Sequence, residues 1–464
     1  MTKSARLLAV LALIASSAAG QGNRVSPILI RNATVLTVTR GTLTGTDLLL
    51  QNGRIAAIGT GLVAPNGATI IDATGRYVMP GIIDPHSHLM VDAINEGSLS
   101  VTSMVRIADV LNPTSVGIHR ALAGGVTTIN ILHGSANTIG GQNATVKLKD
   151  GRSASEMLFP GAMPGIKFAL GENVTRKNSN TVIVQGQPQA PRRYPTSRMG
   201  QAEVLRDAFV RARDYRADWD DFRARTARGQ RGLVAPRRDL ELEPLVEVLD
   251  GKRLVHAHSY RADEMLMLLD LADEFGFKVK TLQHGLEGYK IAPEIAKHGA
   301  GLSTFADSWS YKIEAYDAIP YNVAILMRHG VVATINSDSD ERIRRLNIDA
   351  AKMMRYGGLT EEEALRTITY NGALQLGVQD RVGSIEVGKD ADLAIWSGHP
   401  FSVYSRVDAT LIDGEVFFDR SREAAEQAEL ARERAVLEKA EPNMVPGGPG
   451  RAGRAPPTPT GENN

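Results

Sequence analysis

The sequence predicts an α/β protein in which repeated strand–helix units close into a barrel. Short apolar strands alternate with amphipathic helices between about residues 126 and 370, and such units form parallel sheets that close when there are enough of them. Short strands separated by turn residues flank this region at 27–79 and 385–420. The length of 464 residues is ample for a large core.

The N-terminal residues have the pattern of a secretory signal. Lys3 and Arg6 precede an apolar run from Leu7 to Ile14, and Ser17-Ala18-Ala19 suits a signal-peptidase cut. The run is shorter than the ~20 apolar residues that a membrane span needs. We therefore expect a signal peptide over residues 1–20, a periplasmic or secreted protein, and no membrane span.

The composition excludes several classes of function. Lys and Arg number 53 against 52 Asp and Glu, so no charge bias points to a nucleic-acid partner. The chain has no cysteine, which excludes disulfides, thiolate metal sites and cysteine nucleophiles. We expect a small-molecule or short-peptide substrate, and the sequence leaves a homo-oligomer open.

The flanking strands carry recognisable turns. Asn52-Gly53 separates two short apolar runs, and Asp413-Gly414 has the pattern of a tight hairpin turn. Beyond Ser421 the chain changes to an Ala-, Glu- and Arg-rich segment that predicts an exposed helix. Residues 442–464 are rich in Pro and Gly, which is typical of a disordered tail.

In the middle of the chain, the strands and helices follow one another in pairs. Strands are expected at residues 126–132, 254–258, 279–283, 302–305 and 331–335, and helices at 265–275, 292–297, 322–328, 348–355 and 361–370. Thr360 and Glu363 form a capping box for the last helix. Residues 190–240 interrupt the rhythm with many arginines, and we interpret them as an insertion between barrel strands.

Histidines at strand ends carry the chemical signal. His86 and His88 follow an apolar strand, and residues two apart on a strand share a face, so both imidazoles can face one metal ion. His256, His258, His284 and Asp338 end or follow later strands. Because all strand carboxyl ends of such a barrel open on one face, the pattern predicts a metal site there.

Three more side chains lie just past strand ends, where they can contact a substrate. His133 follows the strand that ends at residue 132, and Arg261 and Tyr289 follow later strands. Arg261 and Tyr289 can hold a substrate carboxylate or carbonyl, with surface ion pairing as the alternative role.

Four motifs, in order, resemble the metal-dependent amidohydrolase superfamily. Residues 79–88, Gln283-His284-Gly285 and 336–339 resemble its first-, sixth- and eighth-strand motifs, and residues 382–393 resemble the return into its small β-sandwich. Imidazolonepropionase-like and prolidase-like members are the most similar. The resemblance implies a distorted (β/α)8 TIM barrel over residues 80–384 with a composite β-sandwich from residues 25–79 and 385–420. Residues 421–464 would then be the charged helix and disordered tail.

The resemblance also implies one or two divalent metal ions, with zinc expected. His86, His88 and Asp338 bind the first ion, and Asp338 acts as the base. A fifth-strand histidine and His284 bind a second ion or the same one. His256 and His258 both suit the fifth-strand position, and His258 is preferred because it lies nearer the mouth.

Lys167 is the remaining ligand candidate. In binuclear relatives a carbamylated lysine at this position bridges two metals, whereas an unmodified ammonium has no lone pair to offer. Glu172 is the rival bridging residue, and a Lys167–Glu172 ion pair is the structural alternative.

These features predict an exported metal-dependent hydrolase that cleaves a C–N bond in an amide, cyclic amide or amidine with a metal-activated water. A metallo-dipeptidase of the prolidase type shares the same site. The alternative from another class is a barrel that binds metal or ligand without turnover. The complete ligand set argues against that alternative, because a decayed site would lose ligands.

Overall fold

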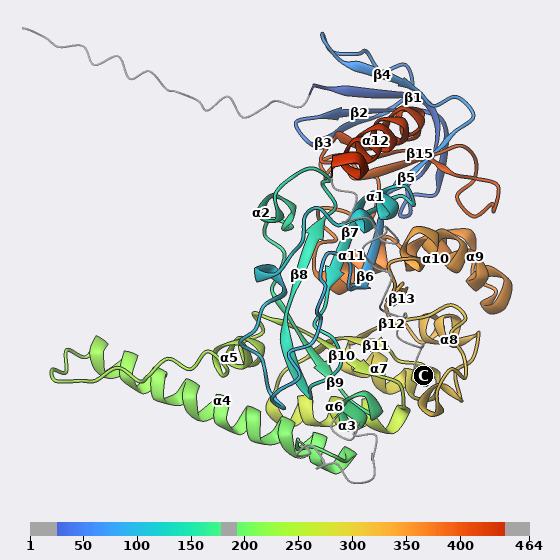
Figure 1. Ribbon diagram of the computed structural model, residues 1–464. Helices are drawn as coiled ribbons and strands as arrows, with labels where there is room; N and C mark the ends of the chain where they lie inside the picture. Colours follow the sequence, from blue (N-terminus) through green and yellow to red (C-terminus); the bar gives the residue numbers. More distant parts are fainter. Residues whose placement is uncertain (1–25, 178–192, 441–464) are drawn as a thin grey trace, which may run out of the picture.

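The computed structural model describes residues 26–177 and 193–440, and their strands form two eight-stranded sheets. Figure 1 shows the sheet of the barrel below the sheet built from the chain ends. The expected signal peptide, the expected disordered tail of residues 442–464 and residues 178–192 lie outside the described residues. In the described part of the chain, no helix combines the length and hydropathy needed to cross a bilayer.

The barrel sheet runs in chain order from β6 to β13. Its strands are β6 (Ile82–Ser87), β7 (Val126–Ile131), β8 (Ile139–Lys147), β9 (Gly165–Ala169), β10 (Leu254–Ser259), β11 (Val279–His284), β12 (Gly301–Thr304) and β13 (Ala333–Ile335). β6 and β7 are parallel, and so are β9 through β13. The expected distorted barrel is confirmed.

The distortion lies in β8, which is antiparallel to both of its neighbours. An antiparallel strand needs only a short connection, and residues 132–138 supply it without a helix. Side chains and loops, rather than a strand ladder, join β6 to the end of β13. Asp84 accepts hydrogen bonds from the Ser337 hydroxyl and, at 3.2 Å, from its N–H, and the Asp338 N–H donates to the His86 carbonyl at 3.2 Å.

Helices cover the barrel in the order expected of strand–helix units. They are α1 (Val116–Leu122), α2 (Ala154–Met157), α3 (Glu172–Lys177), α4 (Arg198–Ala227), α5 (Glu243–Leu249), α6 (Ala262–Phe275), α7 (Ala292–His298), α8 (Asn322–Arg328), α9 (Leu346–Gly357), α10 (Glu361–Thr367) and α11 (Tyr370–Leu376). Both reciprocal bonds of the Thr360–Glu363 capping box are present.

The second sheet joins both ends of the chain, as expected of a composite sandwich. It contains β1 (Ile28–Leu36), β2 (Thr42–Gln51), β3 (Arg54–Gly59), β4 (Thr69–Asp72), β5 (Tyr77–Pro80), β14 (Leu393–Trp396), β15 (Val407–Ile412) and β16 (Glu415–Asp419). β5 and β14 pair antiparallel and join the two halves. Asn52-Gly53 and Asp413-Gly414 have positive φ at both positions, as type I′ hairpin turns require.

A buried lysine holds the barrel against the returning chain. Lys147 on β8 is fully buried, and its ammonium donates to Asp390 at 2.8 Å, Asp392 at 3.1 Å and Asp413 at 2.5 Å. Two of these aspartates belong to the motif that precedes β14. The motif therefore contributes the counter-charges of an interdomain ion cluster.

Two long helices carry the charged segments of the sequence. The first half of α4, in the expected 190–240 insertion, is anchored by buried residues such as Leu205 and Phe209, and Figure 1 shows the rest extending away from the barrel. Ion pairs within the helix, such as Arg225–Asp221 at 3.2 Å and spacing i,i+4, stabilise the second half of α4. α12 (Arg420–Ala440), which runs beside β15, has no buried residue and is the exposed helix that composition predicts.

Candidate metal centre

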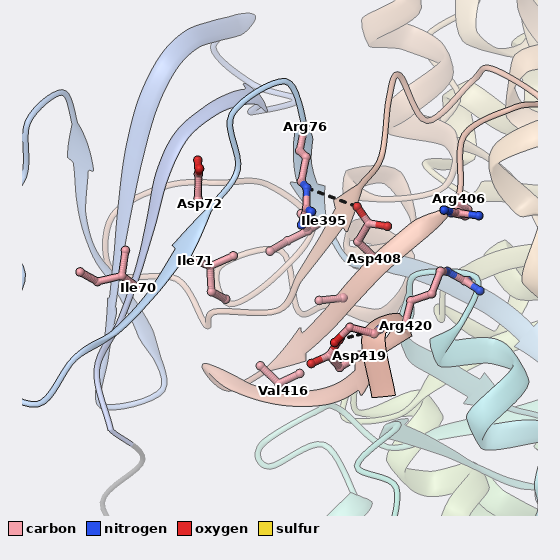
Figure 2. A pocket seen from close by; sticks show the side chains of 12 residues that line it. Ile70, Ile71, Asp72, Arg76, Ile395, Arg406, Asp408, Val416, Asp419 and Arg420 are labelled. Carbon is pink, nitrogen blue, oxygen red and sulfur yellow. Dashed lines mark hydrogen bonds and ion pairs between the residues drawn. The ribbon is translucent and has the colours of Figure 1, made fainter. Parts of the chain in front are cut away.

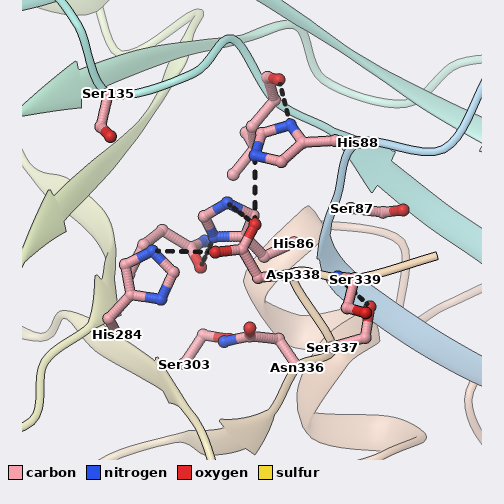
Figure 3. A network of polar contacts seen from close by, with 12 residues as sticks. His86, Ser87, His88, Ser135, His284, Ser303, Asn336, Ser337, Asp338 and Ser339 are labelled. Atoms are coloured by element: carbon pink, nitrogen blue, oxygen red, sulfur yellow. Dashed lines mark hydrogen bonds and ion pairs between the residues drawn. The ribbon is translucent and has the colours of Figure 1, made fainter. Parts of the chain in front are cut away.

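The strand ends bring three histidines and one aspartate to one point. Figure 3 shows the rings of His86, His88 and His284 directed toward the carboxylate of Asp338. Asp338 Oδ1 lies 3.5 Å from His86 Nε2 and 3.1 Å from His88 Nε2, and Oδ2 lies 3.8 Å from His284 Nε2. Ligand atoms of His86, His88 and Asp338 all lie within 4.8 Å of one another. The spacing fits one small cation.

The outer nitrogens of two rings are held by fixed acceptors. His86 Nδ1 lies 3.0 Å from Gln283 Oε1, and His88 Nδ1 lies 3.0 Å from the Leu132 carbonyl. When Nε2 binds a metal ion, such acceptors hold the proton of the ring on Nδ1 and fix the ring's orientation toward the centre. Burial lowers the pKa of His86 well below its usual value and that of His284 to about 3. The rings of His86 and His284 are therefore neutral and suited to bind a metal ion.

Asp338 is set apart by its backbone and its charge. Its φ of 43° is in the left-handed region, which is uncommon for a residue other than glycine. Burial raises its pKa, but the hydrogen bond from His88 and the charge environment of His284, His88 and Lys167 outweigh that effect, so the pKa is lowered. Asp338 is therefore a carboxylate at neutral pH, which suits both a metal ligand and a proton acceptor.

Lys167 lies beside the cluster on β9. It is fully buried, and its Nζ is 3.4 Å from His86 Nε2. Burial lowers its pKa to about 7, with the charge of Asp338 opposing the shift. A neutral amine can react with carbon dioxide, so the position is compatible with the carbamylated bridge. Glu172 instead lies 3.8 Å from the ammonium of Lys312. The bridging role of either residue stays a prediction.

The two fifth-strand histidines occupy different depths. The ring of His258 lies 4.7 Å from that of His284, centroid to centroid, whereas Nδ1 of His256 lies 3.4 Å from the Gln283 amide nitrogen. His256 thus lies behind Gln283, which separates it from His86. The geometry favours His258 as the ligand, and the assignment stays a prediction.

The three expected substrate contacts lie past strand ends, but each polar group already has a partner. His133 accepts from the Glu96 N–H at 2.8 Å through Nε2, and its Nδ1 lies 2.9 Å from the Gly134 carbonyl. Arg261 pairs with Asp263 at 2.9 Å. The Tyr289 hydroxyl donates to the Asp317 carbonyl at 3.0 Å. Burial, together with the charges of Lys167 and His88, lowers the pKa of His133, so this residue lies near the cluster. The substrate roles of all three residues stay predictions.

Two tyrosines beside the cluster were not identified from the sequence. Tyr260 is buried and stacks on His284 with ring centroids 5.4 Å apart. The Tyr311 hydroxyl donates to the Tyr260 hydroxyl at 2.9 Å. Tyr260 follows His258 by two residues, so strand periodicity offered a signal for it. Tyr311 lies in a loop without a periodic pattern.

A separate hollow of about 560 Å³ lies on the sandwich and contains none of the cluster residues. Two of its charged side chains, Arg76 and Asp408, pair with each other, and Figure 2 shows this pair, whose nearest polar atoms are 3.4 Å apart. The hollow lacks convergent ligand groups, so we assign the chemistry to the barrel mouth.

Comparison with known proteins defines the class. The model of the Amidohydrolase family matches residues 77–417, so the chain belongs to that family and with it to the hydrolases that act on carbon–nitrogen bonds. The expected resemblance is confirmed.

The chain is similar to several individual proteins of known sequence or structure. The chain is 32% identical over 406 residues to the amidohydrolase tasK of Hapsidospora irregularis, covering 80% of this chain but only 40% of tasK. It is 24% identical to an imidazolonepropionase of Mesorhizobium japonicum, over 77% of this chain and 87% of that protein. The crystal structure of an amidohydrolase from Thermotoga maritima is similar at 35% identity and a TM-score of 0.76, covering 85% of this chain and all of that one.

Proposed function

We propose that the chain is an exported, metal-dependent hydrolase of amides, cyclic amides or amidines. The observation that carries this proposal is the position of the Asp338 carboxylate, which lies within 3.8 Å of the Nε2 atoms of three buried or half-buried histidines. A carboxylate and several neutral imidazoles are a donor set that divalent zinc prefers.

His86, His88 and Asp338 would hold one ion, and His258 and His284 would serve a second ion or the same one. When bound, such an ion lowers the pKa of a water ligand to about 7 and polarises a carbonyl oxygen. Lys167 would complete a two-metal site as its carbamate, formed when the neutral amine adds carbon dioxide and releases a proton.

The remaining chemistry belongs to the protein. Asp338 is ionised, so its carboxylate accepts the proton of the attacking water and delivers it to the leaving nitrogen. Gln283 holds His86 in place through the contact to Nδ1. Phe305 and Tyr260 both stack on the ring of His284, so they fix the ring and exclude water from it.

A chelator-controlled substrate screen tests the proposal. The purified protein is assayed against N-acyl amino acids, cyclic amides, amidines and dipeptides, because a dipeptidase of the prolidase type would share the site. We expect hydrolysis that a chelator abolishes and zinc restores. The Asp338→Asn variant should lose turnover. Unchanged turnover in Asp338→Asn would contradict the mechanism, and metal binding without turnover of any substrate would favour the binding-protein alternative.

Export rests on residues 1–20 alone and has its own test. We expect the mature protein in the periplasm or medium to lack the signal peptide of residues 1–20, as mass spectrometry of its N-terminal peptide would show. A cytoplasmic protein that keeps residues 1–20 would contradict this part of the proposal.

A further inference from the structure

The first turn of α4 contacts the loops around the barrel mouth, although the proposed chemistry makes no use of this insertion. α4 lies between β9 and β10 in the chain, and its opening residues include Arg198 and the fully buried Gln201. Both side chains contact segments that follow barrel strands. The insertion is therefore joined to the part of the barrel that carries the candidate metal centre.

Arg198 bridges two of these segments. Its Nε donates to Glu264 in the first turn of α6, and its Nη2 donates to Glu314 in the loop that follows β12. Side chains of both glutamates are 3% exposed or less, whereas that of Arg198 is 43% exposed. Burial and the neighbouring Glu314 charge raise the pKa of Glu264 to about 7, and the guanidinium opposes them. Without Arg198, two buried carboxylates would face each other.

Gln201 holds the third segment. Its Oε1 accepts from the Gly171 N–H at 2.9 Å, and its Nε2 donates to the Gly171 carbonyl at 2.8 Å. Gly171 follows β9 and has a φ of +77°. A Cβ there would lie 2.8 Å from Glu314 Oε1 and 2.9 Å from Glu264 Oε2, so only glycine allows this close approach. The Glu172 N–H donates to Glu314 at 2.8 Å and joins this segment to the loop after β12.

The joined segments carry side chains of the mouth. The segment after β9 follows Lys167, the segment between β10 and α6 contains Tyr260, and the loop after β12 contains Tyr311, whose hydroxyl donates to Tyr260. We propose that Arg198 and Gln201 clamp the three loops together and so position the Tyr260–Tyr311 pair beside His284. Arg198 and Gln201 are positioning residues, because they act through the loops and do not contact the metal-site cluster.

Amide hydrogen exchange tests the clamp directly on the full-length protein. In Arg198→Met, we expect exchange of peptides spanning 168–175 and 306–318 to accelerate by about tenfold or more, because charge-assisted hydrogen bonds are lost from locally ordered loops. Arg206→Met is the matched control: Arg206 lies on the same helix and pairs with an exposed glutamate, Glu274, at 3.4 Å. Arg206→Met should leave the exchange rates of both peptides unchanged. Exchange within about twofold of wild type in Arg198→Met overturns the proposal.

Two further variants separate the contacts. Arg198→Lys keeps the charge but can contact only one carboxylate at a time, so exchange should accelerate less than in Arg198→Met. An exchange rate in Arg198→Lys equal to that of the wild-type protein would show that simultaneous contact with both carboxylates is not needed. This result would overturn the proposal, even if Arg198→Met failed to fold. Gln201→Met should accelerate exchange in 168–175 and leave 306–318 closer to wild type.

Kinetics test whether the clamp positions the mouth, and this arm alone rests on the proposed function. With bound metal content unchanged, kcat/KM of Arg198→Met should fall by about tenfold or more, while Arg206→Met retains wild-type values. Faster exchange with unchanged kcat/KM would contradict the positioning role. Absent turnover in the wild-type protein would contradict the proposed function, while the exchange result would still decide whether the clamp exists.

Discussion

Gln283 is expected to control metal affinity without binding the ion. It is fully buried on β11, and its Oε1 lies 3.0 Å from His86 Nδ1. Gln283→Leu preserves approximate volume but removes the acceptor, so the ring of His86 loses the contact that fixes its tautomer and orientation. Loss of such an outer partner lowers metal affinity by about 10- to 100-fold. This corresponds to about 1.4–2.8 kcal/mol of binding free energy.

Competition with a chromophoric chelator measures the zinc Kd of each variant. Gln283→Glu keeps an acceptor for His86 and should bind zinc with close to wild-type affinity. Gln375→Leu is the matched control, because Gln375 is a buried glutamine whose partners are Thr334 and two backbone carbonyls away from the cluster. A zinc Kd for Gln283→Leu within about twofold of wild type would refute the role of this contact.

Two further predictions concern stability. Lys147→Met leaves Asp392 buried without a cation, whereas Asp390 keeps its pair with Arg381. The variant should lower the free energy of unfolding by about 3–5 kcal/mol in urea denaturation, and a change below about 1 kcal/mol would contradict the role of the ion cluster. Burial lowers the pKa of His133 from 6.5 to about 4, so its stabilising contribution is complete above pH 6.5 and is lost as the pH falls toward 4. The neutral ring accepts from the Glu96 N–H, and protonation of Nε2 breaks that bond. The stability difference between wild type and His133→Gln should therefore shrink by up to about 3 kcal/mol across that range, and a pH-independent difference would contradict this account.

The strand order and the cluster were predictable because they follow from local patterns. Apolar runs mark most of the barrel strands, and parallel strands place their carboxyl ends at one mouth. β8 was not predictable in this way. Its segment, Ile139–Lys147, contains two glycines and several polar residues, so its strand conformation comes from pairing with β7 and β9.

The sequence pattern does not predict how deep each side chain lies in the barrel or which loops contact one another. A period of two places His256 and His258 on one face, but only the fold shows that His258 lies beside His284 and His256 behind Gln283. Arg198 meets Glu264 and Glu314, which are 66 and 116 residues away in the chain. No local spacing indicates such a contact.

Anomalous diffraction from zinc-loaded crystals tests the central claim most directly. We expect a zinc peak about 2.0–2.2 Å from Nε2 of His86, Nε2 of His88 and a carboxylate oxygen of Asp338. Crystals that contain zinc but show no peak among these three residues would contradict the proposed metal centre.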